Sequence, residues 1–94
     1  MRVRWLRTAL SNLVAEAEYI SKDNPAAAVH TVQTIVASVE RLSRFPALGR
    51  PGRVLGTREL VVSGTSYIVP YRVRGNTVEI LRVFHAARKW STQL

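Results

Sequence analysis

The segment from Phe45 to Arg53 constrains the fold more than any other part of the chain. Its nine residues contain two prolines and two glycines, a composition typical of an ordered loop that neither a helix nor a strand continues through. Before this segment, apolar residues recur at the three- and four-residue spacing of a helix, and after it they fall in short runs typical of strands. We therefore expect a helical half that this loop joins to a sheet half.

Two helices are predicted before the loop. The first covers residues 9–21, with Thr8 as its N-cap. The second opens at Asn24, which can cap it, with Pro25 in its first turn, and it runs to about Arg44. Because the link between them is short, we expect an antiparallel hairpin that packs on an apolar surface. The side chains expected on the packed faces are Leu10, Leu13, Val14, Ala17 and Ile20 in the first helix and Ala28, Val32, Ile35, Val36, Val39 and Leu42 in the second.

Four strands are predicted, at residues 2–6, 58–62, 67–73 and 77–84. Pro70 cannot donate a backbone hydrogen bond, so it indicates an edge position or a bulge in its strand. The last strand carries the adjacent apolar residues Ile80 and Leu81, which favour a central position. The expected fold class is therefore α+β in the order β-α-α-β-β-β. A mostly antiparallel sheet, packed on one face by the antiparallel helix hairpin, forms a single domain over residues 1–94.

The charge is distributed unevenly along the chain. The net charge is +8, yet residues 1–40 carry four basic and four acidic side chains, whereas residues 41–94 carry ten basic and two acidic ones. Twelve of the fourteen basic residues are arginines, whose planar guanidinium groups suit carboxylates and phosphates. One interpretation is a solvated basic surface, and the other is a docking face for nucleic acid or for an acidic protein segment. The uneven placement favours the docking face.

The chain contains no cysteine, which excludes disulfides, thiolate metal sites and cysteine nucleophiles and suits a reducing cytosol. Its two histidines give no metal-site spacing, and we expect no metal and no cofactor. No apolar run approaches the roughly 20 residues that span a bilayer. We therefore expect a cytoplasmic protein with no membrane partner.

The order of elements and five sequence segments resemble the RelE/ParE toxins of type II toxin–antitoxin systems. The matching segments are residues 15–20, 24–28, 44–50, 67–73 and 80–88, which together span nearly the whole chain. The resemblance implies a toxin that inhibits growth and takes part in functions such as plasmid stabilisation. It also implies a cognate antitoxin, ParD-like or RelB-like. In this family the antitoxin's C-terminal segment folds along the toxin, and we expect it to set apolar and acidic residues against the helix hairpin and the basic sheet.

The family contains two activities, and the residues favour one of them. RelE-like members cut messenger RNA on the ribosome, and many of them carry an arginine just after the first aromatic residue of the third strand, where this chain has Ile68. The segment from Arg82 to Arg88 is similar to the ending of ParE-like chains, which inhibit DNA gyrase. We expect a ParE-like gyrase inhibitor without a catalytic centre. The alternatives are a RelE-like ribosome-dependent mRNA endoribonuclease, whose targets would be the ribosome and mRNA, and a basic nucleic-acid-binding domain.

The candidate site residues lie mostly in the sheet half. His85 is the strongest argument for a ribonuclease, because its unperturbed pKa suits proton transfer, but a histidine that caps a strand end or contacts the antitoxin is the simpler interpretation. If the chain is a ribonuclease, the catalytic candidates are His85, Arg58, Arg72, Arg82 and Arg88. The candidates for binding the target or the antitoxin are Arg50, Arg53, Arg58, Arg72, Arg82, Arg88, Lys89 and Trp90. Trp5 is expected in the core, His30 is expected to be exposed, and Glu16, Glu18 and Tyr19 are assigned to the helix surface without a chemical role.

Overall fold

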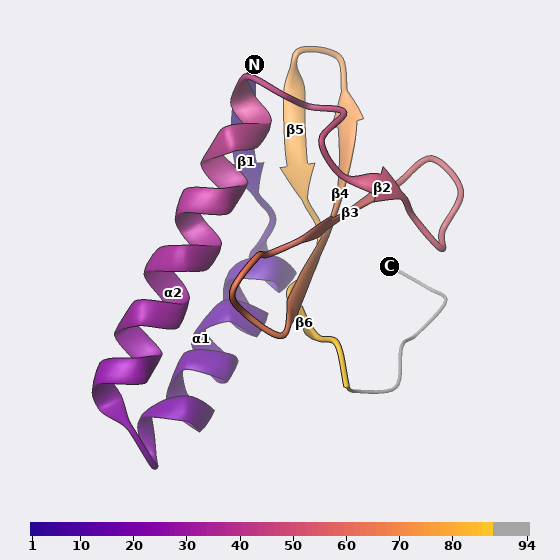
Figure 1. The fold of residues 1–94 in the computed structure, drawn as a ribbon. Coiled ribbons are helices and arrows are strands. Elements are labelled where there is room, and N and C mark those ends of the chain that lie inside the picture. The colour runs from indigo at the N-terminus through magenta and orange to yellow at the C-terminus, as the bar shows by residue number, and fades with distance from the viewer. Residues whose placement is uncertain (88–94) are drawn as a thin grey trace.

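In the computed structural model, which describes residues 1–87, two α-helices pack against one face of a mixed β-sheet (Figure 1). The helices are α1 (Arg7–Ser21) and α2 (Pro25–Glu40), followed by a 3₁₀ turn η1 (Arg41–Ser43). The strands lie in the order β1-β5-β4-β3-β2, and β6 also pairs with β4. Their bounds are β1 (Arg2–Trp5), β2 (Arg50–Pro51), β3 (Arg58–Val61), β4 (Tyr67–Arg74), β5 (Thr77–Ile80) and β6 (Phe84–His85). The predicted α+β fold class is confirmed.

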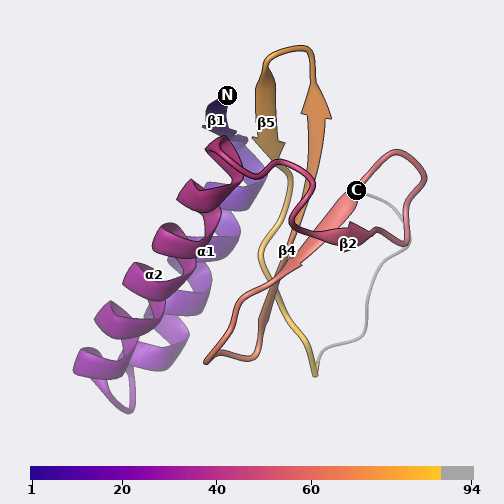
Figure 2. The same ribbon diagram turned by 45° about the horizontal axis from the view of Figure 1, so that its top comes forward.

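The sheet is antiparallel except at one edge, where β1 pairs with β5 in parallel. The turned view in Figure 2 shows the two helices side by side on the same side of the strands, which leaves the other sheet face uncovered by helices. Fully buried side chains from α2, β4 and β5 form the centre of the core between these layers; Ile35, Val39, Val69, Tyr71 and Ile80 are among them. Trp5 is partly buried against this core, on the inward face that the sequence predicts.

The second helix begins as predicted and the first does not. Asn24 Oδ1 accepts a 3.0 Å hydrogen bond from the Ala27 N–H, and Pro25 occupies the first turn. The Thr8 cap is wrong, because α1 already begins at Arg7 and its N-cap is Leu6, which makes no side-chain cap bond. The Leu6 N–H donates to the Ile80 carbonyl at 3.0 Å while the Leu6 carbonyl accepts from Leu10 at 3.1 Å. The end of β1 therefore fixes the start of the helix without a capping side chain.

The core-facing stripe of α1 is rotated from the predicted one. Leu10 and Val14 are 47% and 55% exposed, whereas Ala9 is fully buried and Leu13 and Ile20 pack on the core. The same stripe includes Glu16, which is only 8% exposed, so its assignment to the helix surface is wrong. Tyr67 donates its hydroxyl to Glu16 Oε1 at 3.0 Å, and this bond offsets the cost of burying the carboxylate.

Pro70 explains where the predicted last strand breaks. Its strand β4 is central, so the edge alternative is wrong. A bulge is present, but it lies in the partner strand, where residues 81–83 stand opposite residues 69–70. Tyr71 pairs with Ile80 and Tyr67 pairs with His85, so β5 and β6 differ in register by one residue. Leu81 donates to the Pro70 carbonyl at 2.9 Å, but proline has no N–H to return the bond, and the predicted strand 77–84 is interrupted after Ile80.

Candidate functional site

Four arginines gather on the face of the sheet opposite the helices. Side chains alternate along a strand, and Val3, Trp5, Val78 and Ile80 point inward to the core, so their neighbours point outward. The register places Arg4 beside Glu79 and Glu79 beside Arg72, in one row across three strands. A second row joins Arg2, Thr77 and Arg74 in the same way. We call these six residues the arginine face; they are Arg2, Arg4, Arg72, Arg74, Thr77 and Glu79.

Glu79 is the one acidic residue of the arginine face, and it is only 7% exposed. Arg72 Nε lies 2.7 Å from Glu79 Oε1, and Arg74 Nε lies 3.8 Å from the same oxygen. The hydrogen bond from Arg72 lowers the pKa of the Glu79 carboxyl from its ordinary value; burial opposes this shift, and the charges of Arg72, Arg74 and Arg4 add to it. Beside this carboxylate lies a hollow of about 500 Å³, lined by Arg2, Val3, Arg4, Arg74, Thr77 and Glu79. Its volume falls within the range of small-ligand sites.

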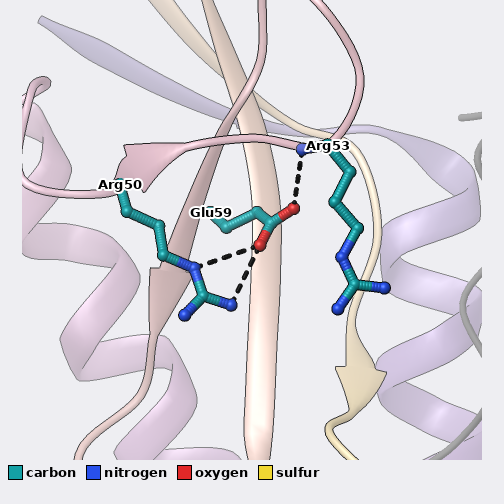
Figure 3. A network of polar contacts seen from close by, with 3 residues as sticks. All are labelled: Arg50, Arg53 and Glu59. Carbon is teal, nitrogen blue, oxygen red and sulfur yellow. Dashed lines mark hydrogen bonds and ion pairs between the residues drawn. The ribbon is translucent and has the colours of Figure 1, made fainter.

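A second polar cluster surrounds Glu59, which is 3% exposed, at the edge of the sheet (Figure 3). Arg50 donates from Nε and Nη2 to Glu59 Oε1 at 3.2 and 3.1 Å, and the Arg53 backbone N–H donates to Oε2 at 3.0 Å. Figure 3 shows the Arg50 and Arg53 side chains on either side of the carboxylate. Glu59 therefore fixes the chain between β2 and β3 and neutralises part of the local positive charge.

The loop that precedes β2 is attached to the core through Tyr71, which is fully buried. The Tyr71 hydroxyl donates to the Pro46 carbonyl at 2.7 Å and accepts from the Gly49 N–H at 2.8 Å. A Cβ at Gly49 would lie 2.7 Å from the Tyr71 ring and 2.9 Å from the Glu59 carbonyl, so this close approach requires glycine. Burial raises the pKa of the Tyr71 hydroxyl, against the opposing effects of the Gly49 hydrogen bond and the Arg58 charge.

Within residues 1–87, the structure does not gather the predicted catalytic residues into one site. Arg58 donates to the Gly49 carbonyl at 2.9 Å and so belongs to the loop attachment. Arg72 lies on the arginine face, bound to Glu79. Arg82 Nη1 donates a 2.8 Å hydrogen bond to the Leu81 carbonyl. Leu81 lies opposite Pro70, which has no N–H to donate to that carbonyl, so the Arg82 side chain supplies the donor instead. The remaining predicted site residues Arg88, Lys89 and Trp90 lie outside the described residues.

His85 lies in β6 at the far end of the sheet from the arginine face. Its ring meets the Tyr67 ring edge-on, with centroids 5.3 Å apart, and its Nδ1 accepts a 3.2 Å hydrogen bond from the Ala87 N–H. A pocket of about 400 Å³ opens beside it, lined also by Tyr19 and by His30, which is exposed as predicted. The two histidines thus line one pocket, a juxtaposition that sequence reasoning missed because 55 residues separate them.

Sequence reasoning also missed Arg2 and Arg4, which it assigned to the neutral half of the chain. The alternation of Arg2 and Arg4 with Val3 and Trp5 was the available signal, since it places both arginines on the outward face of the first strand. What the sequence did not reveal is that β1 pairs in parallel with β5. That pairing brings both arginines into the same rows as Arg72 and Arg74 from the other half, on the opposite side of β5.

Residues 1–87 contain no group of three or more histidine, cysteine, aspartate or glutamate side chains that could hold a metal ion. Neither α1 nor α2, the helices of this region, is long and apolar enough to cross a membrane.

Comparison with known proteins identifies the family. Residues 3–90 match the model of the ParE toxin of type II toxin–antitoxin systems, parDE. The protein Y4kP of Sinorhizobium fredii, named as a toxin, is 47% identical over 89 residues, which cover 95% of this chain and 92% of that protein. Toxin RelE2 of Caulobacter vibrioides is 34% identical over 87 residues, which cover 93% of this chain and 97% of that toxin.

Two solved structures are similar in fold and sequence. The chromosomal ParDE toxin–antitoxin system from P. aeruginosa contains a chain with a TM-score of 0.83 and 33% identity, covering 90% of this chain and 95% of that chain. The toxin–antitoxin complex RelBE2 from Mycobacterium tuberculosis contains a chain with a TM-score of 0.59 and 33% identity, covering 93% of this chain and 92% of that chain. The match to the family model and the identity to these relatives lead to one conclusion: the chain belongs to the ParE toxin family of type II toxin–antitoxin systems.

Proposed function

We propose that this toxin inhibits DNA gyrase by binding it, without cutting RNA, and that a cognate antitoxin neutralises it. The observation that carries the proposal is the separation of the residues that a ribonuclease would need. RNA cleavage requires a base, an acid and a cation at one phosphate. Among the described residues, the candidates for these roles are engaged in different parts of the fold.

The separation follows from the pairing along β4. Arg58 pairs with Tyr71, whose ring is in the core, so Arg58 lies on the helix side, whereas Arg72 lies on the opposite face. His85 pairs with Tyr67, five residues along β4 from Arg72, and five residues of strand span roughly 17 Å. One reacting phosphate is too small to contact Arg58, Arg72 and His85 at once, because the two arginines lie on opposite faces of the sheet and His85 lies far along it.

The structural comparison points in the same direction. The overlap with the ParDE chain from P. aeruginosa has a TM-score of 0.83, against 0.59 for the RelBE2 chain, although the identity is 33% in both cases. The backbone thus agrees better with the ParE-type toxin than with the RelE-type toxin at equal sequence similarity. This difference supports the gyrase proposal over the ribonuclease alternative.

The antitoxin proposal is supported by apolar surface on the helix hairpin. Val14 on α1 and Val29 on α2 are 55% and 58% exposed. A largely apolar groove of about 460 Å³ runs between the helices, lined by Ala17, Glu18, Ser21, Pro25, Ala28, Val29, Val32 and Gln33. An amphipathic segment that folds on binding could bury its apolar side chains in this groove and direct its acidic side chains to basic residues of the sheet, such as Arg50.

The ribonuclease remains the second candidate, because His85 lines an open pocket and its Nε2 makes no hydrogen bond within residues 1–87. One pair of assays separates the two functions. Purified toxin is added to gyrase with supercoiled plasmid, and separately to a translating extract whose messages are mapped by primer extension. We expect accumulated gyrase cleavage complexes and uncut messages. Codon-linked RNA cuts that disappear in His85→Ala would refute the gyrase proposal.

A further inference from the structure

The hollow on the arginine face is lined by three arginines, and the proposed function does not use it. We propose that it binds the phosphate backbone of duplex DNA; this rests on the proposed function, because gyrase holds DNA and a toxin docked on gyrase can contact that DNA. The arginine face contains four guanidinium groups and one carboxylate, so its formal charge is +3. The contacts of each group show which charges are available to a ligand.

The carboxylate of Glu79 occupies one part of the arginine face only. It binds Arg72 at 2.7 Å and lies 3.8 Å from Arg74, whose side chain is still 68% exposed. Arg2 and Arg4 are exposed, and within residues 1–87 neither guanidinium forms an ion pair or a hydrogen bond. Arg2, Arg4 and Arg74 therefore keep donors for an anion at the rim of the hollow.

The hollow is built on strands, which makes it rigid. Arg2 and Arg74 stand in the row of Thr77, and Arg4 stands in the row of Glu79. Neighbouring strands lie about 4.8 Å apart, and side chains on one face of a strand recur about every 6.6 Å. The arginine side chains therefore leave the backbone at regularly spaced positions. The Thr77 hydroxyl lines the same hollow and can donate to a phosphate oxygen. The helices lie on the other side of the sheet and leave this face open (Figures 1 and 2).

The composition of this surface favours nucleic acid over an acidic protein. Protein interfaces centre on apolar or aromatic side chains, whereas DNA-binding surfaces are polar and strongly positive. The hollow is lined by charged and hydroxyl side chains, with half-buried Val3 as its apolar member. Most strongly exposed apolar side chains lie on the helices or on the loops before β3; among them are Leu10, Val14, Val29, Phe45, Leu48 and Leu55. Two more lie on strands: Val61 pairs with Ile68, four residues along β4 from Arg72, and Val73 pairs with Val78, whose side chain is in the core. None of these side chains lines the hollow.

The test measures how DNA binding depends on salt. Full-length toxin is titrated into a fluorescent duplex of arbitrary sequence at several KCl concentrations. Three phosphate contacts give a slope of log K against log salt of about −2.7, which is about a 40-fold loss of affinity between 50 and 200 mM salt. The variant Arg2→Gln/Arg74→Gln keeps one of these contacts, so its loss over the same range is only about 3- to 4-fold. Arg72 is left intact, since its removal would leave the buried Glu79 without its partner.

A control variant removes one positive charge far from the arginine face. Lys22 is exposed in the link between α1 and α2, at the opposite end of the molecule from the β1–β5 edge (Figure 1), so Lys22→Gln should keep nearly the wild-type slope. Antitoxin binding by both variants reports whether they fold and whether the arginine face holds a protein instead. We expect it to be unchanged.

Three results would overturn the inference. These are a wild-type slope near zero, an equal slope in the double variant, or a loss of antitoxin affinity as large as the loss of DNA affinity. Tighter binding of single-stranded RNA of the same length would reject duplex DNA as the ligand. The gyrase assay described above is read separately: a toxin that inhibits gyrase but binds no DNA refutes only this inference, and one that binds DNA but leaves gyrase active refutes only the proposed function.

Discussion

Replacement of Tyr71 by phenylalanine tests whether the loop before β2 is held to the core by one hydroxyl. Tyr71→Phe removes the bond donated to the Pro46 carbonyl and the bond accepted from the Gly49 N–H, both made by a fully buried side chain. Each bond contributes about 1 kcal/mol, and a buried N–H left without an acceptor adds about 1 kcal/mol or more. We expect the free energy of unfolding to fall by about 2 to 3 kcal/mol. That is a large share of the roughly 5 to 15 kcal/mol typical of a domain.

Urea unfolding followed by far-ultraviolet circular dichroism measures this change. With a slope of about 1 to 3 kcal/mol per molar urea, the transition midpoint should fall by about 0.7 to 3 M. Tyr19→Phe is the matched control, because the Tyr19 side chain is 62% exposed and water can replace a lost hydrogen bond. A midpoint for Tyr71→Phe within experimental error of the control would refute the reasoning.

The same substitution has a consequence at alkaline pH. The pKa of Tyr71 is raised in the folded state above its ordinary value of 10.0, so the folded protein holds this proton more tightly than the unfolded chain. The stability that this group contributes is complete below pH 10 and is lost as pH rises from there through the raised pKa. Wild-type protein should therefore destabilise above pH 10 more steeply than Tyr71→Phe. Equal slopes for the two proteins would contradict the assigned burial.

Three further predictions concern other contacts. Glu59→Gln should lower the free energy of unfolding by about 1 to 2 kcal/mol; the value is kept small because the partner side chain of Arg50 is half exposed. The variant should also be cleaved faster by a protease between β2 and β3. An unchanged cleavage rate would show that Glu59 does not hold this segment in place. The pKa of Glu79 is lowered in the folded state, so the stability that its carboxylate contributes is complete above pH 4.5, its ordinary pKa, and is lost as the pH falls through the lowered pKa. The stability of Arg72→Gln, measured over the same acid range, should fall less than that of the wild type. Asn24→Ala removes the cap of α2 and should cost about 1 kcal/mol in a thermal melt, whereas Asn24→Gly should cost only a few tenths.

The elements that the sequence predicts best are those with local causes. Asn24 and Pro25 start α2 because a side-chain acceptor and a missing N–H act within one helical turn, and the structure has both features. Pro70 indicates a bulge for an equally local reason, although its central strand could not be inferred from residues 67–73 alone. Thr8 had the right chemistry for a cap, but the hydrogen bond from the Leu6 N–H to the Ile80 carbonyl fixes the helix start earlier, at Arg7.

The features that were missed depend on contacts between distant parts of the chain. Glu16 reads as a surface residue until Tyr67, 51 positions away, supplies a hydroxyl for its carboxylate. Some apolar residues of α1, such as Leu10, are exposed in the structure. Because the hydrophobic pattern counted them as buried, it predicted the wrong face of the helix to pack on the core. The candidate site shows the same limit: Arg72 was predicted in it, whereas Arg2 and Arg4 join it through a parallel pairing that no local pattern encodes.

The parallel edge strand also sets when the arginine face of a newly made chain can assemble. β1 precedes both helices in the chain, but β5, the strand it pairs with, comes from residues 77–80, after the helices and after β2, β3 and β4. Contacts of such long sequence separation form late, after the intervening helices have had time to fold. A nascent chain stopped before Thr77 would have its helix hairpin and the two arginines ahead of α1. It could not pair β1 with β5, so Arg2 and Arg4 would not share rows with Arg74 and Arg72. A cell that makes this protein is therefore exposed to an assembled arginine face only after β5 has been translated.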